Sequence, residues 1–134
     1  NSIQNNPFGF SIDLTNISEV SSNILATWTT NPILNGSEGA VTQLEFNNGA
    51  TITTNTTANA NVKGLIWQTG FSQTSTHAMC ATSTYGTGRV FVVTDSSPMD
   101  DGTGNPADNL FPGWTSFSHS KLFMNASLWL AKIQ

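Results

Sequence analysis

The sequence predicts a single α/β domain, and three of its segments carry that prediction. Residues 89–94 hold four consecutive apolar residues, which is typical of a β-strand that is covered on both faces, usually by helices. Residues 121–132 are apolar around most of a helical circumference, which predicts a largely buried C-terminal helix capped by Ser118 or Ser120. The Asn-Gly pair at 48–49 lies between two apolar, β-branched runs and predicts an antiparallel β-hairpin.

Weaker patterns assign the remaining segments. Apolar and polar residues alternate over 8–14, which predicts a short strand. A helix is expected over 18–29, ended by the Asn-Pro pair that follows it, although Thr and Trp are indifferent helix formers. The apolar run at 62–67 and the Thr-rich run at 77–84 are expected to be extended, and a turn is expected at 85–88.

Length and charge exclude several classes of protein. The chain has 134 residues, which is enough for one domain. Its formal net charge of −4 argues against a nucleic-acid-binding surface and against docking on an anionic membrane. No apolar run approaches the roughly 20 residues that a membrane span needs. Asn, Ser and Thr together make up 49 residues, and this neutral polar composition favours a secreted or periplasmic protein.

Cys80 is the single cysteine of the chain. It excludes an internal disulfide framework and any site built from several cysteines. Its neighbours from Ala78 to Ala81 are apolar, which predicts a small buried side chain rather than a nucleophile.

The segment from Asp95 to Phe117 has 23 residues, and loops of that length are often functional. Its acidic and amide side chains suggest a calcium site, because hard cations prefer oxygen ligands from flexible loops. The alternative is a solvated loop in which Asp, Asn, Gly and Pro supply turn geometry. The candidate calcium ligands are Asp95, Asp100, Asp101, Asp108 and Asn109.

Asp95 also follows a predicted buried strand, where open α/β sheets place their ligands. With Ser96 or Ser97 as nucleophile and His119 as base, this end of the sheet could hold a hydrolase site. The Gly-x-Ser-x-Gly nucleophile motif is absent, however. The alternative is that Asp95 and the two serines hold the loop by hydrogen bonds to its backbone.

Two further side chains are candidates for carbohydrate contact or modification. Trp114 lies in the long loop and is the best candidate for an exposed stacking platform, whereas Trp67 and Trp129 lie in apolar runs that predict core positions. Asn125-Ala-Ser matches the glycosylation acceptor pattern, but Asn125 lies inside the predicted apolar helix, where a glycan would disrupt packing.

Two stretches near the C-terminus resemble the end of class I glutamine amidotransferase-like domains. These are Tyr85–Gly104, which contains Arg-Val-Phe-Val-Val-Thr-Asp-Ser-Ser, and Leu122–Ala131; a looser match is Asn31-Pro-Ile-Leu-Asn-Gly36. The resemblance implies a flavodoxin-like fold in which such a strand ends the sheet and such a helix packs beneath it. It also implies a secreted or periplasmic bacterial protein of the Bacteroidetes type.

The sequence departs from the amidotransferase pattern in its catalytic residues. No Gly-x-Cys-x-Gly occurs, and Asp95-Ser96-Ser97 stands where the family has its His-x-Glu. Glutaminase activity is therefore not expected. The first βαβ units of the family would precede Asn1, so the chain is expected to be the later part of a larger domain. It would then pair through an open edge with the missing N-terminal part, a second chain or another copy of itself.

Two functions follow as hypotheses. The first is a non-catalytic accessory or ligand-binding module of a secreted bacterial protein, with Asp95, Ser96, Trp114 and His119 as its binding residues. The second is a hydrolase-type enzyme that uses Asp95, Ser96 or Ser97, and His119, with calcium as its candidate cofactor.

Overall fold

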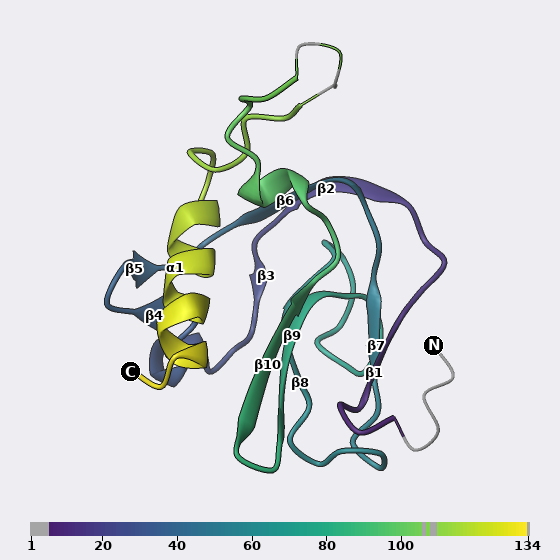
Figure 1. The fold of residues 1–134 in the computed structure, drawn as a ribbon. Helices are drawn as coiled ribbons and strands as arrows, with labels where there is room; N and C mark the ends of the chain where they lie inside the picture. Colours follow the sequence, from purple (N-terminus) through teal and green to yellow (C-terminus); the bar gives the residue numbers. More distant parts are fainter. Residues whose placement is uncertain (1–5, 106, 108–109, 134) are drawn as a thin grey trace.

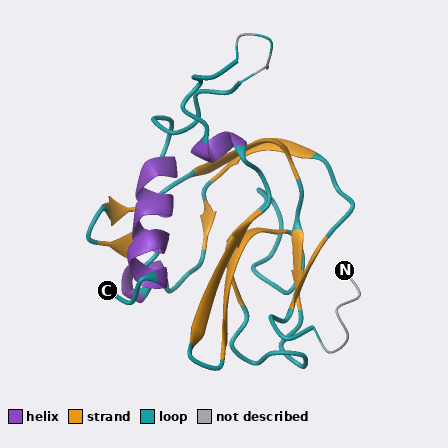
Figure 2. Ribbon diagram, in the orientation of Figure 1, coloured by secondary structure: helices purple, strands orange, loops and turns teal. Residues whose placement is uncertain are grey.

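The computed structural model describes residues 6–105, 107 and 110–133 (Figure 1). It is a mixed α/β fold with mostly antiparallel sheets and one C-terminal helix (Figure 2). The strands are β1 (Phe10–Ile12), β2 (Ile17–Ser21), β3 (Asn23–Ile24), β4 (Asn35–Gly36), β5 (Gly39–Ala40), β6 (Leu44–Gly49), β7 (Ile52–Thr54), β8 (Lys63–Trp67), β9 (Ala78–Tyr85) and β10 (Gly88–Val93). Two 3-10 helices, η1 (Trp28–Thr30) and η2 (Ser97–Met99), precede the α-helix α1 (His119–Leu130).

The main sheet is built around β9. Its strand order is β1-β7-β9-β8-β3, and β10 also pairs with β9. Ala81 pairs with Gly64 of β8 and with Val92 of β10, so these two strands lie on opposite edges of β9. Beyond the end of β10, Ile52 of β7 pairs with Ala78 on the same edge. The central position of β9 explains why its first six residues are all buried.

The β9–β10 hairpin confirms the predicted turn at 85–88 and the predicted strand that follows it. Tyr85 pairs with Gly88, and the positive φ of 58° at Gly86 suits the first position of a type II′ turn. The strand is half-buried rather than fully covered on both faces. Phe91 packs against Phe123 of α1, with ring centroids 6.0 Å apart, while Val92 packs against the smaller core cluster.

The C-terminal helix forms where the sequence predicts it, but it is less buried than expected. Leu122, Phe123 and Ala126 face the core, whereas Met124 and Leu130 are exposed. Within the described residues, no second layer covers the apolar side chains on the outer side of the helix.

The predicted helix over 18–29 is wrong. The structure forms β2, β3 and η1 in that segment. β2 pairs with β6, and β3 pairs with β8. The backbone N–H and C=O groups of this segment therefore bond to strands far along the chain instead of to each other within a helix. Thr and Trp have weak helix propensity, so little helical stability is lost when this segment forms strands.

The predicted hairpin at Asn48-Gly49 is also wrong. β6 continues through Gly49 along β2, while β7 belongs to the main sheet. The register shifts from Ile17↔Gly49 to Glu19↔Phe46, which places one extra residue on β6 as a β-bulge. Asn48 has a φ of 64°. The left-handed conformation expected there is therefore present, but it lies in the β-bulge of β6 and not in a hairpin turn.

Two apolar clusters hold the fold together. The larger one includes Leu44, Phe46, Leu65, Met79 and Leu122, and so joins β6, the main sheet and α1. The smaller one holds Ile52, Trp67, Ala78 and Ala81. No helix in the described part of the chain is long and apolar enough to cross a membrane.

Candidate functional site

The start of the long loop is tied to the bulge in β6. Asp95 accepts the backbone N–H of Ser97 at 2.8 Å through Oδ1, and that of Asn47 through Oδ2. The Ser97 hydroxyl donates to the Asn47 carbonyl at 3.3 Å, whereas Ser96 is exposed. Asp95 and Ser97 thus make the backbone hydrogen bonds that the loop-holding alternative predicts.

The end of the loop is tied down by His119, which is fully buried. Its Nδ1 donates to the Gly113 carbonyl at 2.7 Å, and its Nε2 accepts the Glu45 N–H at 2.9 Å. Only the neutral ring can accept at Nε2, because Glu45 offers a donor there. Burial lowers the pKa of His119, and it outweighs the opposing effects of the Gly113 hydrogen bond and of the Glu45 and Asp95 charges.

This geometry does not bring the candidate hydrolase residues together. Both ring nitrogens of His119 hold backbone groups, and the Ser97 hydroxyl is directed to Asn47. His77 stacks on Phe71 with ring centroids 3.8 Å apart, and its Nδ1 lies 3.1 Å from Gln68 Oε1. Neither histidine hydrogen-bonds to Ser96 or Ser97 among the described residues.

The carboxylates of the loop also hold nearby backbone. Asp100 accepts the N–H groups of Gly102 and Phe111 at 2.9 and 3.0 Å, which closes the base of the loop. Asp101 accepts the Thr103 hydroxyl and N–H, and these hydrogen bonds lower its pKa. Within residues 6–105, 107 and 110–133, no three acidic, His or Cys side chains gather as a metal site. Asp108 and Asn109, two of the predicted calcium ligands, lie outside the described residues, so the calcium site stays a prediction.

Trp67 and Trp129 pack in or against the apolar core, as the sequence predicts, and Trp114, the predicted platform, is only partly exposed. Trp114 is half-buried, and its backbone N–H donates to the Asp100 carbonyl at 2.8 Å. Trp67 is buried, with its Nε1–H donating to the Thr74 carbonyl at 2.9 Å. Trp129 lies beneath Arg89, whose guanidinium carbon is 5.0 Å from the ring centroid.

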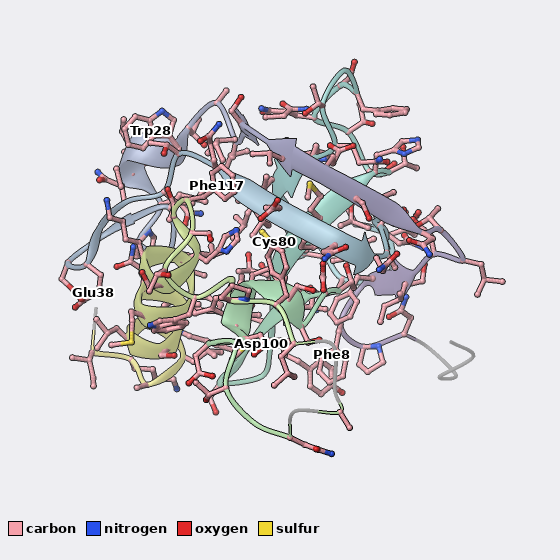
Figure 3. The ribbon with its side chains drawn as sticks, turned by 90° about the horizontal axis from the view of Figure 1, so that it is seen from above. Phe8, Trp28, Glu38, Cys80, Asp100 and Phe117 are labelled. Carbon is pink, nitrogen blue, oxygen red and sulfur yellow. The ribbon has the colours of Figure 1, made fainter. Side chains whose placement is uncertain are left out.

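Trp28 instead lines a surface groove that the sequence did not indicate. This groove, named here the Trp28 groove, has a volume of about 270 Å³ and is lined by Ser22, Ile24, Trp28, Val41 and Thr42. Trp28 is the first residue of η1, and Figure 3 labels its side chain. The lining residues come from two segments separated along the chain and share no motif, which explains why sequence reasoning missed them.

The Trp28 groove connects to the end of the long loop. The Thr42 N–H donates to the Ser118 hydroxyl at 3.0 Å, and the two hydroxyl oxygens lie 3.1 Å apart. Ser118 and His119 therefore hold both Thr42 and Glu45 next to the first turn of α1. Phe117, which directly precedes Ser118, is exposed. The predicted functional loop thus ends beside this groove.

The Trp28 groove is electrically neutral and keeps unused hydrogen-bonding groups. None of its lining residues carries a charge. No described residue hydrogen-bonds to the Ser22 hydroxyl or to the Trp28 indole N–H. Val41 is buried and Ile24 half-buried, whereas Ser22 and Thr42 are exposed, so the lining combines apolar side chains with exposed hydroxyl-bearing residues.

Comparison with protein-family models, with curated proteins and with solved structures gave no match for this chain.

Proposed function

We propose that this protein is a non-catalytic ligand-binding module of a secreted bacterial protein, and that the Trp28 groove binds one sugar ring of a neutral carbohydrate. The observation that carries the proposal is the neutral lining of that groove, which includes one tryptophan and two hydroxyl-bearing residues.

The chemistry of the lining selects the ligand class. A charged ligand would lose hydration without gaining a charged partner, which is costly. A pyranose has an apolar C–H face that suits an indole, and hydroxyl groups that suit Ser22 and Thr42. The volume of about 270 Å³ lies just below the usual range of ligand pockets, about 300–1,000 Å³, so it suits a single ring better than a large cofactor.

The catalytic alternative is not proposed, because no specific contact favours it. General base catalysis needs a nitrogen or carboxylate that is available to the reacting group. His119 has both nitrogens on backbone partners, and Asp95 accepts two backbone N–H groups.

The test is a fluorescence titration with neutral hexasaccharides of α- and β-linked glucose. We expect a saturable change in tryptophan emission with at least one of them. Trp28→Ala should abolish it, and Ser22→Ala should weaken binding several-fold. Trp114→Ala is the matched control, since that half-buried indole lies outside the groove, and it should keep the wild-type affinity. A wild-type protein that shows no saturable response to any neutral oligosaccharide would overturn the proposal.

We further propose that the chain belongs to the flavodoxin-like, class I glutamine amidotransferase-like domains. The support is the sequence resemblance. Its two closer stretches fall on the β9–β10 turn, β10, the long loop and α1, and the looser one includes β4. The described residues place no strand on the outer edge of β10, where a larger domain or a partner chain could add one. An experimental structure of the full natural protein tests this: parallel strands joined to this sheet would support it, and a wholly antiparallel protein would contradict it.

A further inference from the structure

A second groove lies at the tip of the β9–β10 hairpin, far from the residues of the Trp28 groove in the sequence. It has a volume of about 300 Å³, and Asn59, Asn61, Thr84 and Tyr85 contribute its polar and aromatic lining. We name it the Tyr85 groove. Pro7 closes one side, next to Phe8, which Figure 3 labels on the opposite side of the molecule from Trp28.

Asn59 makes the rim of the Tyr85 groove rigid. Its Nδ2 donates to the Pro7 carbonyl at 2.7 Å and to the Thr84 carbonyl at 2.9 Å, and its Oδ1 accepts the Asn61 N–H at 2.8 Å. A Cβ on Gly9 would lie 2.8 Å from the Asn59 Cβ, so the N-terminal segment packs closely on this side chain. One amide therefore fixes three separate segments around the groove before any ligand arrives.

The remaining polar groups of the Tyr85 groove are unused. No described residue hydrogen-bonds to the side chain of Asn61, Thr84 or Tyr85. Tyr85 is 63% exposed, and its ring lies in an edge-to-face arrangement with the Phe8 ring, with centroids 6.2 Å apart. An amide, a hydroxyl and an aromatic ring thus face solvent together on a rigid support.

We propose that the Tyr85 groove is a second carbohydrate-binding site, in which a sugar ring stacks on Tyr85 and bonds to Asn61 and Thr84. Its lining carries no charge, so the argument for a neutral ligand is the one that supports the proposed function. The site itself is independent of the Trp28 groove, because the two grooves share no residue.

Two binding sites on one module favour a polymeric ligand, because one polymer can occupy both sites. Once one ring of a polysaccharide is bound, the second site meets the rest of the same chain at a high effective concentration. Linked binding of this kind raises affinity by about 10²–10⁴-fold when the geometry allows both contacts. The protein is therefore expected to bind a neutral polysaccharide more tightly than a hexasaccharide of the same linkage.

Calorimetric titration tests the inference, with the hexasaccharide of α- or β-linked glucose that binds and with the soluble polysaccharide of the same linkage. The expected stoichiometry for the hexasaccharide is two per wild-type chain and one for Tyr85→Ala. The affinity of Tyr85→Ala for the polysaccharide should fall at least tenfold, and Tyr85→Phe should keep most of it because the ring remains. Phe71→Ala, which removes another exposed aromatic ring, is the matched control and should behave as wild type.

The outcomes separate the two proposals. Wild-type stoichiometry and affinity in Tyr85→Ala would overturn the second site, whereas the proposed function would stand if Trp28→Ala still lost binding. Loss of binding in Tyr85→Ala but not in Trp28→Ala would overturn the Trp28 groove and leave the Tyr85 groove. Melting curves of both variants check that each remains folded.

Discussion

The backbone N–H of Glu45 donates to Nε2 of His119 at 2.9 Å, and this hydrogen bond joins β6 to the first residue of α1. The other ring nitrogen holds the Gly113 carbonyl at 2.7 Å, so one imidazole connects a strand, a helix and the end of the long loop. Ser118 makes the parallel contact to Thr42 one residue earlier. The neutral histidine is therefore part of the support beneath the Trp28 groove.

Stability should fall as the pH is lowered through the range in which His119 titrates. The folded-state pKa of His119 lies below the usual 6.5, so the unfolded chain takes up a proton more readily than the folded one. The stabilising contribution is complete above about pH 6.5, and it declines below that pH until the folded-state pKa is reached. Urea unfolding between pH 7.5 and 5.5 should show a free energy of unfolding that decreases by up to about 1.4 kcal/mol per pH unit.

His119→Gln is the control for that pH dependence. A glutamine can accept the Glu45 N–H and donate to the Gly113 carbonyl, but it does not take up a proton in this range. The slope between pH 7.5 and 5.5 should therefore be much smaller in the variant, which keeps His77. An unchanged slope would show that groups other than His119 cause the pH dependence.

Asn125 should be essential for packing α1 against the β4–β5 hairpin. It is fully buried, its Nδ2 donates to the Ile33 and Gly39 carbonyls at 3.1 and 3.0 Å, and its Oδ1 accepts the Glu38 N–H at 3.0 Å. Asn125→Leu leaves these backbone groups without partners and should cost about 2–4 kcal/mol in the free energy of unfolding. Chemical denaturation measures the loss. Ser127→Ala, on the exposed side of the same helix, should stay within about 1 kcal/mol of wild type; equal losses in both variants would contradict the assignment.

The Asn125 contacts show what the sequence could and could not predict. The helix itself was predictable because its pattern is local, and so were β10 and the turn before it. The partners of Asn125 were not, because Ile33 and Gly39 lie 92 and 86 residues away in the chain. The same limit explains the failed helix over 18–29, whose backbone pairs with β6 and β8 instead.

The candidate site divides in the same way. The sequence predicts that Asp95 directly follows a strand, and β10 does end at Val93, two residues before it. The Trp28 and Tyr85 grooves arise only when distant segments meet, so no spacing along the chain indicates them. Trp114, the predicted platform, is half-buried near the base of the loop, so its role in ligand contact stays a prediction.

Cys80 should be inert to thiol reagents while the protein is folded. It is fully buried in β9, and burial raises the pKa of its thiol far above the usual range. Labelling with iodoacetamide, followed by intact mass, should give no adduct in native buffer and complete modification in denaturant. The labelling rate in intermediate urea should follow the unfolded fraction. Rapid labelling of the native protein would show that β9 opens locally without global unfolding.

Asp95→Ala should loosen the start of the long loop without unfolding the domain. The substitution removes the acceptor for the N–H groups of Asn47 and Ser97, and each orphaned donor costs about 1–3 kcal/mol when it stays buried; at this half-exposed site, water offsets part of that cost. Hydrogen exchange at these two amides should speed up at least tenfold, together with a loss of about 1–2 kcal/mol in stability. Ser96→Ala is the matched control, because Ser96 is exposed and should change stability by no more than about 0.5 kcal/mol. If Asp95→Ala kept wild-type exchange at Asn47 and Ser97, the carboxylate would not hold the loop, and a role in ligand contact would become the better explanation for its position.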